Sequence, residues 1–370
     1  APKGEYYVVQ VLENLEEVSY LDHAQLHVVD HPAEVSVYPN ERFGGSGPPP
    51  YELFHIRKPI LPLRASDDSG MDVVSTLTQI DRTYPDRFKV EERLPGYAET
   101  HTLNLDFGSA LKGKENLVLF LYGWVDYGYS STNLAAFQAG ILPISPKLET
   151  VGEGGEWETL EEDMGYPAGL PRMMTVDLRK HGPFTDSRFR ITTNLRVYWD
   201  QIFLAEVEKD SDAKITKLPV SYADLHARGY PREHSPDGKK PLVYDYGIMD
   251  RSFPFRNLAG AYTRFGGVTE LLSEVDDRFV IFGRGEEITL KFKATGLPHL
   301  PKGWKRDYLF VSNGYCKDMD PNTAFPDTVE PLPFRGMSAY PYPEGEHYPD
   351  DAAHQAYRKT YNTRQVSGRP

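Results

Sequence analysis

Residues 117–124 read LVLFLYGW, a run that is apolar on both faces when it is extended. Such a run is typical of a strand at the centre of a sheet that is covered on both sides. Residues 188–207 read RFRITTNLRVYWDQIFLAEV and predict at least two strands, with a break near residues 193–194. Several strands at short spacing, separated by turn residues, favour an antiparallel β-sandwich or jelly roll.

The rest of the chain also favours strands over helices. Further strands are expected at residues 6–12, 18–21, 25–30, 34–38, 102–107, 173–178 and 307–311. Residues 278–283 and 287–292 predict a hairpin across the turn Arg284-Gly285. Short helices are expected at residues 73–80 and 268–272. With 31 glycines and 30 prolines in 370 residues, the chain is predicted to be mainly β, with long Pro/Gly-rich loops and few short helices.

Changes in composition divide the chain into five expected segments. The linker signals are GGSGPPP at residues 44–50 and a polar, proline-interrupted stretch at residues 218–240. We expect an N-terminal β segment, a connecting segment, a β-sandwich (jelly-roll-like) domain, a second β-rich region and a Pro/Tyr-rich tail, at residues 1–64, 65–95, 96–217, 218–340 and 341–370.

The charge balance limits the classes of partner. The sequence has 41 Lys and Arg against 54 Asp and Glu, a formal net charge of −13. An acidic chain is a poor partner for nucleic acid and anionic lipid, because both require a cationic face. No apolar run approaches the ~18 residues of a transmembrane helix, so no membrane span is expected. Residues 1–4 lack a signal-peptide core, so we expect targeting information to be cleaved or absent.

A calcium site is the best candidate for a metal centre that the residue pattern offers. Asp318, Asp320 and Asn322 place oxygen donors at every second position, as in Asp-x-Asp-x-Asn loops that bind Ca²⁺. Two features depart from that pattern: Thr323 stands where glycine is expected, and no acidic residue occupies the twelfth position. The alternative is a turn held by the Asp and Asn side chains themselves.

The sequence shows no assembled catalytic motif. It lacks a Gly-x-Ser-x-Gly elbow and a phosphate-binding glycine loop, and its single cysteine, Cys316, has no His partner that spacing can assign. That single cysteine also excludes an internal disulfide, a Cys-rich zinc site and covalent haem attachment. Carboxylates are plentiful, for instance at residues 161–163, so a hydrolase that uses a carboxylate pair remains an alternative. We therefore assign no catalytic residue.

Aromatic side chains form the remaining pattern. One group could either fill a core or present a binding face: Tyr122, Trp124, Tyr127, Tyr129, Tyr198 and Trp199. A second group predicts a C-terminal tail that docks onto another surface, because rigid Pro and Tyr residues bury area at low entropic cost: Tyr340, Tyr342, Tyr348, Tyr357 and Tyr361.

Several strings resemble the C-terminal region of bacterial secreted FG-GAP repeat proteins with an ASPIC/UnbV-type segment, relatives of the cartilage acidic protein group. These strings are LEEVSYLD (15–22), VDHP through YPNE (29–41), GYPAGLP with TVDL (165–178), NLRVYWDQ (194–201) and DPNT with TVEPLPF (320–334). The resemblance implies an extracytoplasmic, multi-domain protein whose relatives often carry a calcium-binding propeller or tetratricopeptide repeats. This chain lacks the repeated Asp-x-Asp-x-Asp-Gly blades, so no propeller site carries over.

Together these features favour a non-catalytic, extracytoplasmic protein that is periplasmic, secreted or at the cell surface. We expect it to bind other protein subunits or a surface glycan, as an accessory subunit of a larger assembly. Two alternatives stay open: a carbohydrate-active hydrolase that uses a carboxylate pair, and a calcium-stabilised structural module.

Overall fold

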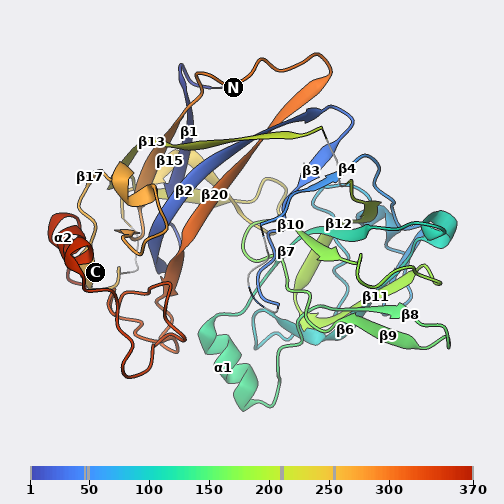
Figure 1. The fold of residues 1–370 in the computed structure, drawn as a ribbon. Coiled ribbons are helices and arrows are strands. Elements are labelled where there is room, and N and C mark those ends of the chain that lie inside the picture. Colours follow the sequence, from blue (N-terminus) through green and yellow to red (C-terminus); the bar gives the residue numbers. More distant parts are fainter. Residues whose placement is uncertain (1, 46, 48–50, 209–211, 253–255, 369–370) are drawn as a thin grey trace. The chain divides into compact units, whose positions relative to one another are not determined.

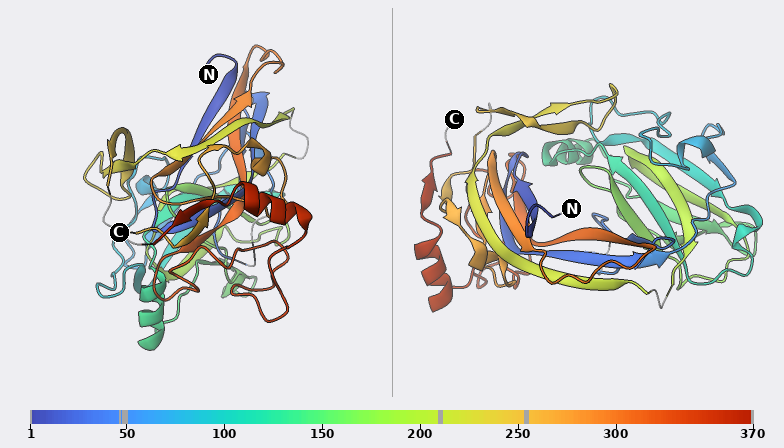
Figure 2. Two further views of the ribbon diagram at one scale, coloured as in Figure 1. Left: turned by 90° about the vertical axis from the view of Figure 1, so that its left-hand side faces the viewer. Right: turned by 90° about the horizontal axis from the view of Figure 1, so that it is seen from above.

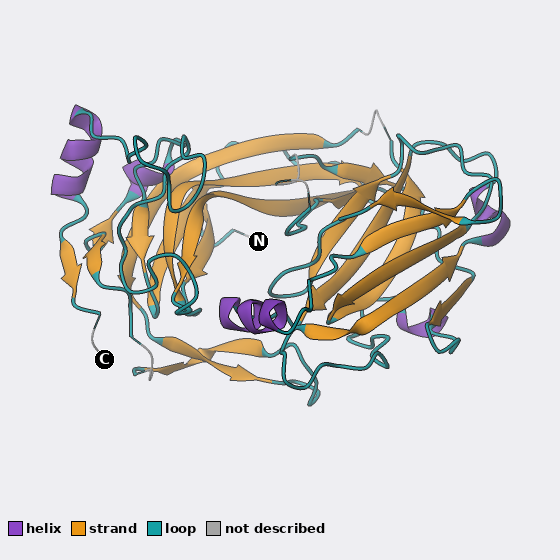
Figure 3. Cartoon of the chain, turned by 90° about the horizontal axis from the view of Figure 1, so that it is seen from below, coloured by secondary structure: helices purple, strands orange, loops and turns teal. Residues whose placement is uncertain are grey.

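The protein is described by a computed structural model, which covers residues 2–45, 47, 51–208, 212–252 and 256–368. The chain is mainly β and its sheets are antiparallel, as the sequence predicts (Figures 1 and 3). It divides into two compact units: unit 1 comprises residues 1–31 and 213–370, and unit 2 comprises residues 32–212. This division differs from the five consecutive segments that composition suggests, because the two ends of the chain share one unit.

Unit 2 is built on two sheets that pack face to face (Figure 2). One sheet has the strand order β10-β7-β12, with bounds Arg172–Asp177, Leu117–Val125 and Val197–Glu206. The other has the order β5-β6-β11-β8-β9, with bounds Arg64–Asp67, Tyr97–Asp106, Arg188–Leu195, Lys147–Val151 and Trp157–Glu161. One apolar core contains side chains of both sheets, which is the arrangement of a β-sandwich.

The strand β7 is apolar on both faces because both of its faces are covered. Leu119 and Leu121 point into the core between the two sheets, whereas Phe120 points to the opposite side. There a short β3–β4 pair, Ser36–Tyr38 with Phe54–Ile56, covers the sheet. The rings of Phe120 and Phe203 stack with centroids 4.9 Å apart in this outer layer. The short helices of unit 2 are α1 (Ser130–Gln138), η1 (Val74–Thr76) and η2 (Gly108–Leu111).

Residues 188–207 form two strands, as predicted, but these strands lie in different sheets. The break falls at Arg196, between β11 in the five-stranded sheet and β12 in the three-stranded sheet. The expected break was two to three residues earlier. A chain that crosses from one sheet to the other in this way ties the sandwich together.

Unit 1 contains a sheet of seven strands with the order β1-β19-β13-β2-β18, in which β17 also pairs with β13 and β20 with β2. The bounds are Tyr6–Leu12, Glu286–Lys293, Lys214–Ala227, Glu17–Pro32, Val280–Phe282, Gly266–Gly267 and Trp304–Asp318 in that order. Two further pairs are β14–β15 (Tyr230–His234 with Val243–Asp250) and β16–β21 (Gly260–Tyr262 with Arg364–Val366). The helices are η3 (Thr269–Leu272) and α2 (Ala352–Thr360).

The predicted hairpin across Arg284-Gly285 is wrong, although both of its strands exist. Strand β18 pairs with β2, and strand β19 pairs with β1 and β13. Val280 and Phe282 belong to one apolar cluster and Ile281 to another, so β18 is buried on both faces. The pattern of apolar side chains along a strand shows which of its faces are buried, but it does not show which strand is its hydrogen-bonded neighbour.

Candidate functional site

The six aromatic residues predicted as one binding face do not share a face. Tyr198 lies opposite Trp124 in the β12–β7 ladder, and their rings stack with centroids 4.4 Å apart. The next residue, Trp199, points to the opposite side and is buried in the core between the sheets. Trp124 is buried as well. The predicted face is therefore corrected: its two tryptophans are structural.

The other tyrosines of that group are more accessible. Tyr127 and Tyr129 are exposed, and Tyr122 is half-buried on β7. A binding role for these three side chains stays a prediction.

The tyrosines predicted to dock onto another surface pack instead onto unit 1 itself. Tyr357 and Tyr361 join the cluster around β19, and Tyr348 joins a second cluster. The buried hydroxyl of Tyr357 donates to the carbonyl of Phe279 at 2.7 Å. The idea of a free docking arm is therefore wrong for these three residues, because their apolar area is already buried within the chain.

Tyr340 and Tyr342 are half-buried at the margin of unit 1. The ring of Tyr342 meets Phe334 edge-on at a centroid distance of 5.2 Å. The hydroxyl of Tyr340 donates to the carbonyl of Pro331 at 2.8 Å. Lys317 on β20 donates to the Tyr340 hydroxyl at 3.1 Å, and Tyr342 packs against the cluster around Tyr20, so both side chains hold the C-terminal segment against its own unit.

The loop predicted to bind Ca²⁺ adopts the alternative turn geometry. Asp318 Oδ1 accepts the backbone N–H of Asp320 at 2.8 Å, and Asp320 Oδ1 accepts the backbone N–H of Asn322 at 2.9 Å. Within the described ranges, no group of three or more His, Cys, Asp or Glu side chains is placed to hold a metal ion. These hydrogen bonds account for the loop conformation without a metal ion, and the calcium site stays a hypothesis.

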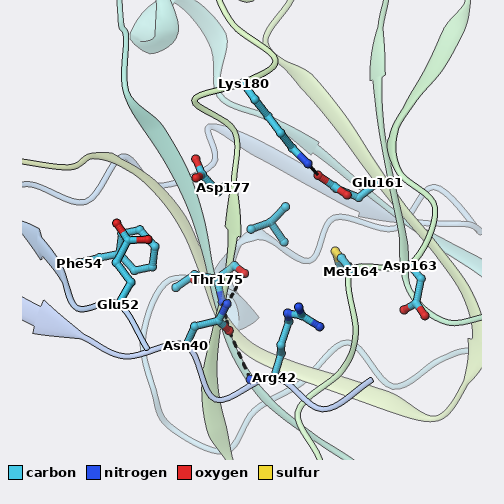
Figure 4. A pocket seen from close by; sticks show the side chains of 11 residues that line it. Asn40, Arg42, Glu52, Phe54, Glu161, Asp163, Met164, Thr175, Asp177 and Lys180 are labelled. Atoms are coloured by element: carbon cyan, nitrogen blue, oxygen red, sulfur yellow. Dashed lines mark hydrogen bonds and ion pairs between the residues drawn. The ribbon is translucent and has the colours of Figure 1, made fainter. Parts of the chain in front are cut away.

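A pocket in unit 2 brings together charged side chains from distant parts of the sequence. We call it the edge pocket, because β10 and β9, an outer strand of each sheet, contribute to its wall. Its volume is about 240 Å³. The charged side chains that line it are Arg42, Glu52, Glu161, Asp163, Asp177 and Lys180. Asn40, Phe54, Met164, Thr175 and Val176 complete the wall (Figure 4).

Asn40 positions one wall of the edge pocket. Its amide donates to the carbonyl of Thr175 and accepts the Thr175 N–H, both at 3.2 Å, much as a paired strand residue would. The same Asn40 oxygen accepts the Arg42 N–H at 3.3 Å (Figure 4). The backbone N–H of Glu41 donates to the carbonyl of Met173 at 2.9 Å. Residues 40–42 are thereby held along the open side of β10, with the Arg42 side chain at the pocket.

Ion pairs hold three of the four carboxylates of the edge pocket. Lys180 Nζ lies 2.5 Å from Glu161 Oε1, and His181 Nε2 lies 3.2 Å from the same oxygen. Arg179, adjacent to the pocket, contacts both Asp177 at 2.7 Å and Glu52 at 3.2 Å. Each of these three carboxylates therefore has a cationic neighbour, whereas Asp163 accepts the Gly165 N–H at 2.9 Å.

These ion pairs also keep two carboxylates ionised. Burial alone would raise the pKa of Glu161, but hydrogen bonds from Lys180 and His181 outweigh it and lower that pKa. The hydrogen bond from Arg179 lowers the pKa of Asp177, against a smaller opposing effect of burial. A general acid for glycoside cleavage needs a raised pKa instead. The geometry thus supplies fixed hydrogen-bond acceptors rather than a proton donor.

Thr175 adds a polar group to the same wall. Its hydroxyl oxygen is buried and has no hydrogen-bond partner in the described part of the chain. Buried polar groups are normally satisfied, so a group of this kind in a pocket wall is suited to a ligand.

Sequence reasoning identified residues 161–163 as carboxylates but missed Asn40, Arg42 and Lys180. Asn40 and Thr175 are 135 positions apart, and no periodicity connects them. The one local signal was the end of the strand at residues 34–38, where Asn40 follows a proline. Loop residues after a strand often carry binding groups, but that signal names no partner.

Comparison with known proteins does not place the chain in a family. No protein-family model matches the sequence, and no curated protein matches it. Among solved structures, a rhamnosidase from Novosphingobium sp. PP1Y aligns with a TM-score of 0.22 and 11% identity, over 78% of this chain. The alignment spans 23% of the rhamnosidase. Likeness at this level supports no conclusion about fold or activity.

Proposed function

We propose that this chain is a non-catalytic binding protein whose unit 2 takes a neutral, hydroxyl-rich ligand, a glycan, in the edge pocket. The observation that carries this proposal is that the pocket wall combines hydrogen-bond donors with acceptors. Lys180 and Arg42 are donors, whereas Glu52 and Asp163 are acceptors. Sugar hydroxyl groups both donate and accept, so they match such a wall.

The size and charge of the edge pocket narrow the ligand. A volume of about 240 Å³ is below the roughly 300–1,000 Å³ of sites for drug-sized ligands, so it suits a single sugar ring. Four carboxylates and two cations line the pocket, an excess of negative charge that disfavours uronic or sulfated sugars. Phe54 supplies an apolar wall for the C–H groups of a ring.

The same observations weigh against the hydrolase alternative. Glu161 and Asp177 are held ionised by Lys180 and Arg179, so neither is suited to protonate a leaving group. We propose binding without cleavage for this reason. The wider role, as an extracytoplasmic accessory subunit, is proposed from the sequence resemblance alone. Mass spectrometry of the native protein with its co-purifying partners tests that role.

Glycan binding is tested on an array of neutral and aminated oligosaccharides, followed by calorimetry on the best ligand. Lys180→Gln combined with Glu52→Gln should weaken binding at least tenfold, because each hydrogen bond to a charged group is worth about 1.5–3 kcal/mol. Lys89→Gln is the matched control, since Lys89 forms an exposed ion pair with Glu99 elsewhere in unit 2. Wild-type affinity in the double variant, or release of free sugar by the wild type, would refute the proposal.

A further inference from the structure

The five-stranded sheet of unit 2 has one polar face. Arg64, Asp106 and Arg188 are opposite one another on β5, β6 and β11 and form one row across the strands. The next row continues with Asn104 and Arg190 on β6 and β11. Residues opposite one another in a sheet point to the same side, so both rows face away from the apolar core.

A tryptophan stands at one end of this polar face in a fixed orientation. The guanidinium of Arg190 lies 4.4 Å from the ring centroid of Trp157. Arg190 in turn forms two hydrogen bonds with Glu149, at 2.8 and 2.9 Å. Arg190 is the main cause that lowers the pKa of the Glu149 carboxyl to about 2, so this ion pair persists down to strongly acidic pH. Trp157 is therefore held on the sheet by a rigid polar support.

Two side chains on the face are free to bind. The Asn104 amide and the Arg64 guanidinium have no hydrogen bond or ion pair to any other described residue, although each lies in a paired strand. Their neighbours are already satisfied: Asp106 accepts Gly108 N–H and the Ser187 hydroxyl, both at 2.8 Å. Polar groups without internal partners are what a binding surface offers to a ligand.

A groove of about 440 Å³ connects these groups. Trp157, Arg188, Asp106, Asn104 and Arg64 line it, together with Asp72. Two arginines face two aspartates, so the groove carries no strong net charge. From β5 to β9 there are four strand spacings of ~4.8 Å, a span of ~19 Å that exceeds one sugar ring.

We infer that this sheet-face groove is a second carbohydrate site, which takes an extended segment of a neutral glycan lying across the strands. Trp157 stacks on one sugar ring, while Asn104 and Arg64 hydrogen-bond to hydroxyl groups further along the chain. The groove takes a longer ligand than the edge pocket, which suits a single sugar ring. It does not depend on whether the edge pocket binds sugar.

The test is calorimetric titration of the full chain with neutral hexaoses of glucose, xylose and mannose, and with the corresponding disaccharides. We expect a hexaose to bind at least tenfold more tightly than its disaccharide. Trp157→Ala and Asn104→Ala should each weaken the hexaose at least fivefold, and Trp157→Phe should restore most of the affinity. In the Lys180→Gln background, Trp157→Ala should still weaken the hexaose by the same factor as in wild type.

Trp304→Ala is the matched control, because Trp304 is also half-buried and lies under a cation, Lys214, but belongs to unit 1. Melting temperatures of all variants establish that they are folded. Equal hexaose affinity in wild type and in the folded Asn104→Ala and Trp157→Ala variants overturns the inference. Failure of every hexaose to bind overturns it as well. Loss of hexaose binding in Lys180→Gln alone would assign the glycan to the edge pocket.

Discussion

Glu13 is a buried carboxyl that should make the stability of unit 1 depend on pH. It is 6% exposed, in the turn between β1 and β2. Burial is the largest cause that raises its pKa to about 7, and the charge of Glu17 adds to it. Hydrogen bonds from the Ser19 hydroxyl at 2.5 Å and the Leu15 N–H at 2.8 Å oppose the shift in part.

The sign and size of the effect follow from the two protonation states. The ordinary pKa of a glutamate is 4.5, so between pH 4.5 and about 7 the folded state binds more protons than the unfolded state. Stability contributed by protonated Glu13 is therefore complete below pH 4.5 and is lost as the pH rises to about 7. A difference of 2.5 pKa units, 7 minus 4.5, corresponds to about 3 kcal/mol at most.

Glu13→Gln tests this reasoning because glutamine resembles the protonated carboxyl and does not titrate. Its free energy of unfolding should match that of wild type at pH 4.5 and exceed it by about 3 kcal/mol at pH 8. Urea denaturation followed by circular dichroism at several pH values measures this difference. Glu5→Gln, at an exposed position in the same unit, is the control and should change little. A Glu13→Gln curve that runs parallel to wild type from pH 4.5 to 8 would refute the argument.

Three further predictions concern stability. Burial lowers the pKa of Lys317 from 10.5 to about 8, so the stability of the wild type should rise between pH 8 and 10.5. In thermal melts Lys317→Met should remove that rise, and the same pH dependence of the melting temperature in the variant would contradict the expectation. Tyr357→Phe should lower the free energy of unfolding by about 1 kcal/mol in urea, because the Phe279 carbonyl then keeps only the longer hydrogen bond from the Thr263 hydroxyl, at 3.4 Å. An unchanged free energy of unfolding would contradict this expectation. A chelator should leave the melting temperature unchanged, because the carboxylates of Asp318 and Asp320 already accept backbone N–H groups. If the chelator lowers the melting temperature of the wild type but not that of Asp320→Ala, the calcium site is established instead.

The secondary structure of unit 2 was largely readable from its sequence. The run at 117–124 predicted a strand covered on both faces, and β7 has apolar clusters on both sides. The segment 188–207 predicted two strands, and β11 and β12 are those strands. The pattern at residues 73–80 predicted a helix, but the structure forms only the single turn η1 there. Too few apolar positions repeat to support a longer helix.

The candidate sites were much less readable. The aromatic pattern around residue 124 identified side chains that are mostly structural, because the adjacent residues Tyr198 and Trp199 point to opposite sides of one strand. The sequence indicates neither the edge pocket nor the sheet-face groove. Both depend on side chains that are far apart in sequence, such as Asn40 with Thr175 and Trp157 with Arg190.

By itself, the sequence determined that this protein is an acidic, mainly β chain with turns at its glycines and prolines, because strand propensity and alternation depend on near neighbours. The tertiary structure decided which strands pair, which tyrosines are buried and which polar groups line a pocket. Those outcomes depend on contacts between residues far apart in the sequence, such as the strand pair of Val280 with Leu21. Their pairing is set by which side chains are buried in the common core. The two candidate binding surfaces are formed by residues that only the folded sheets bring together, so they follow from the tertiary structure.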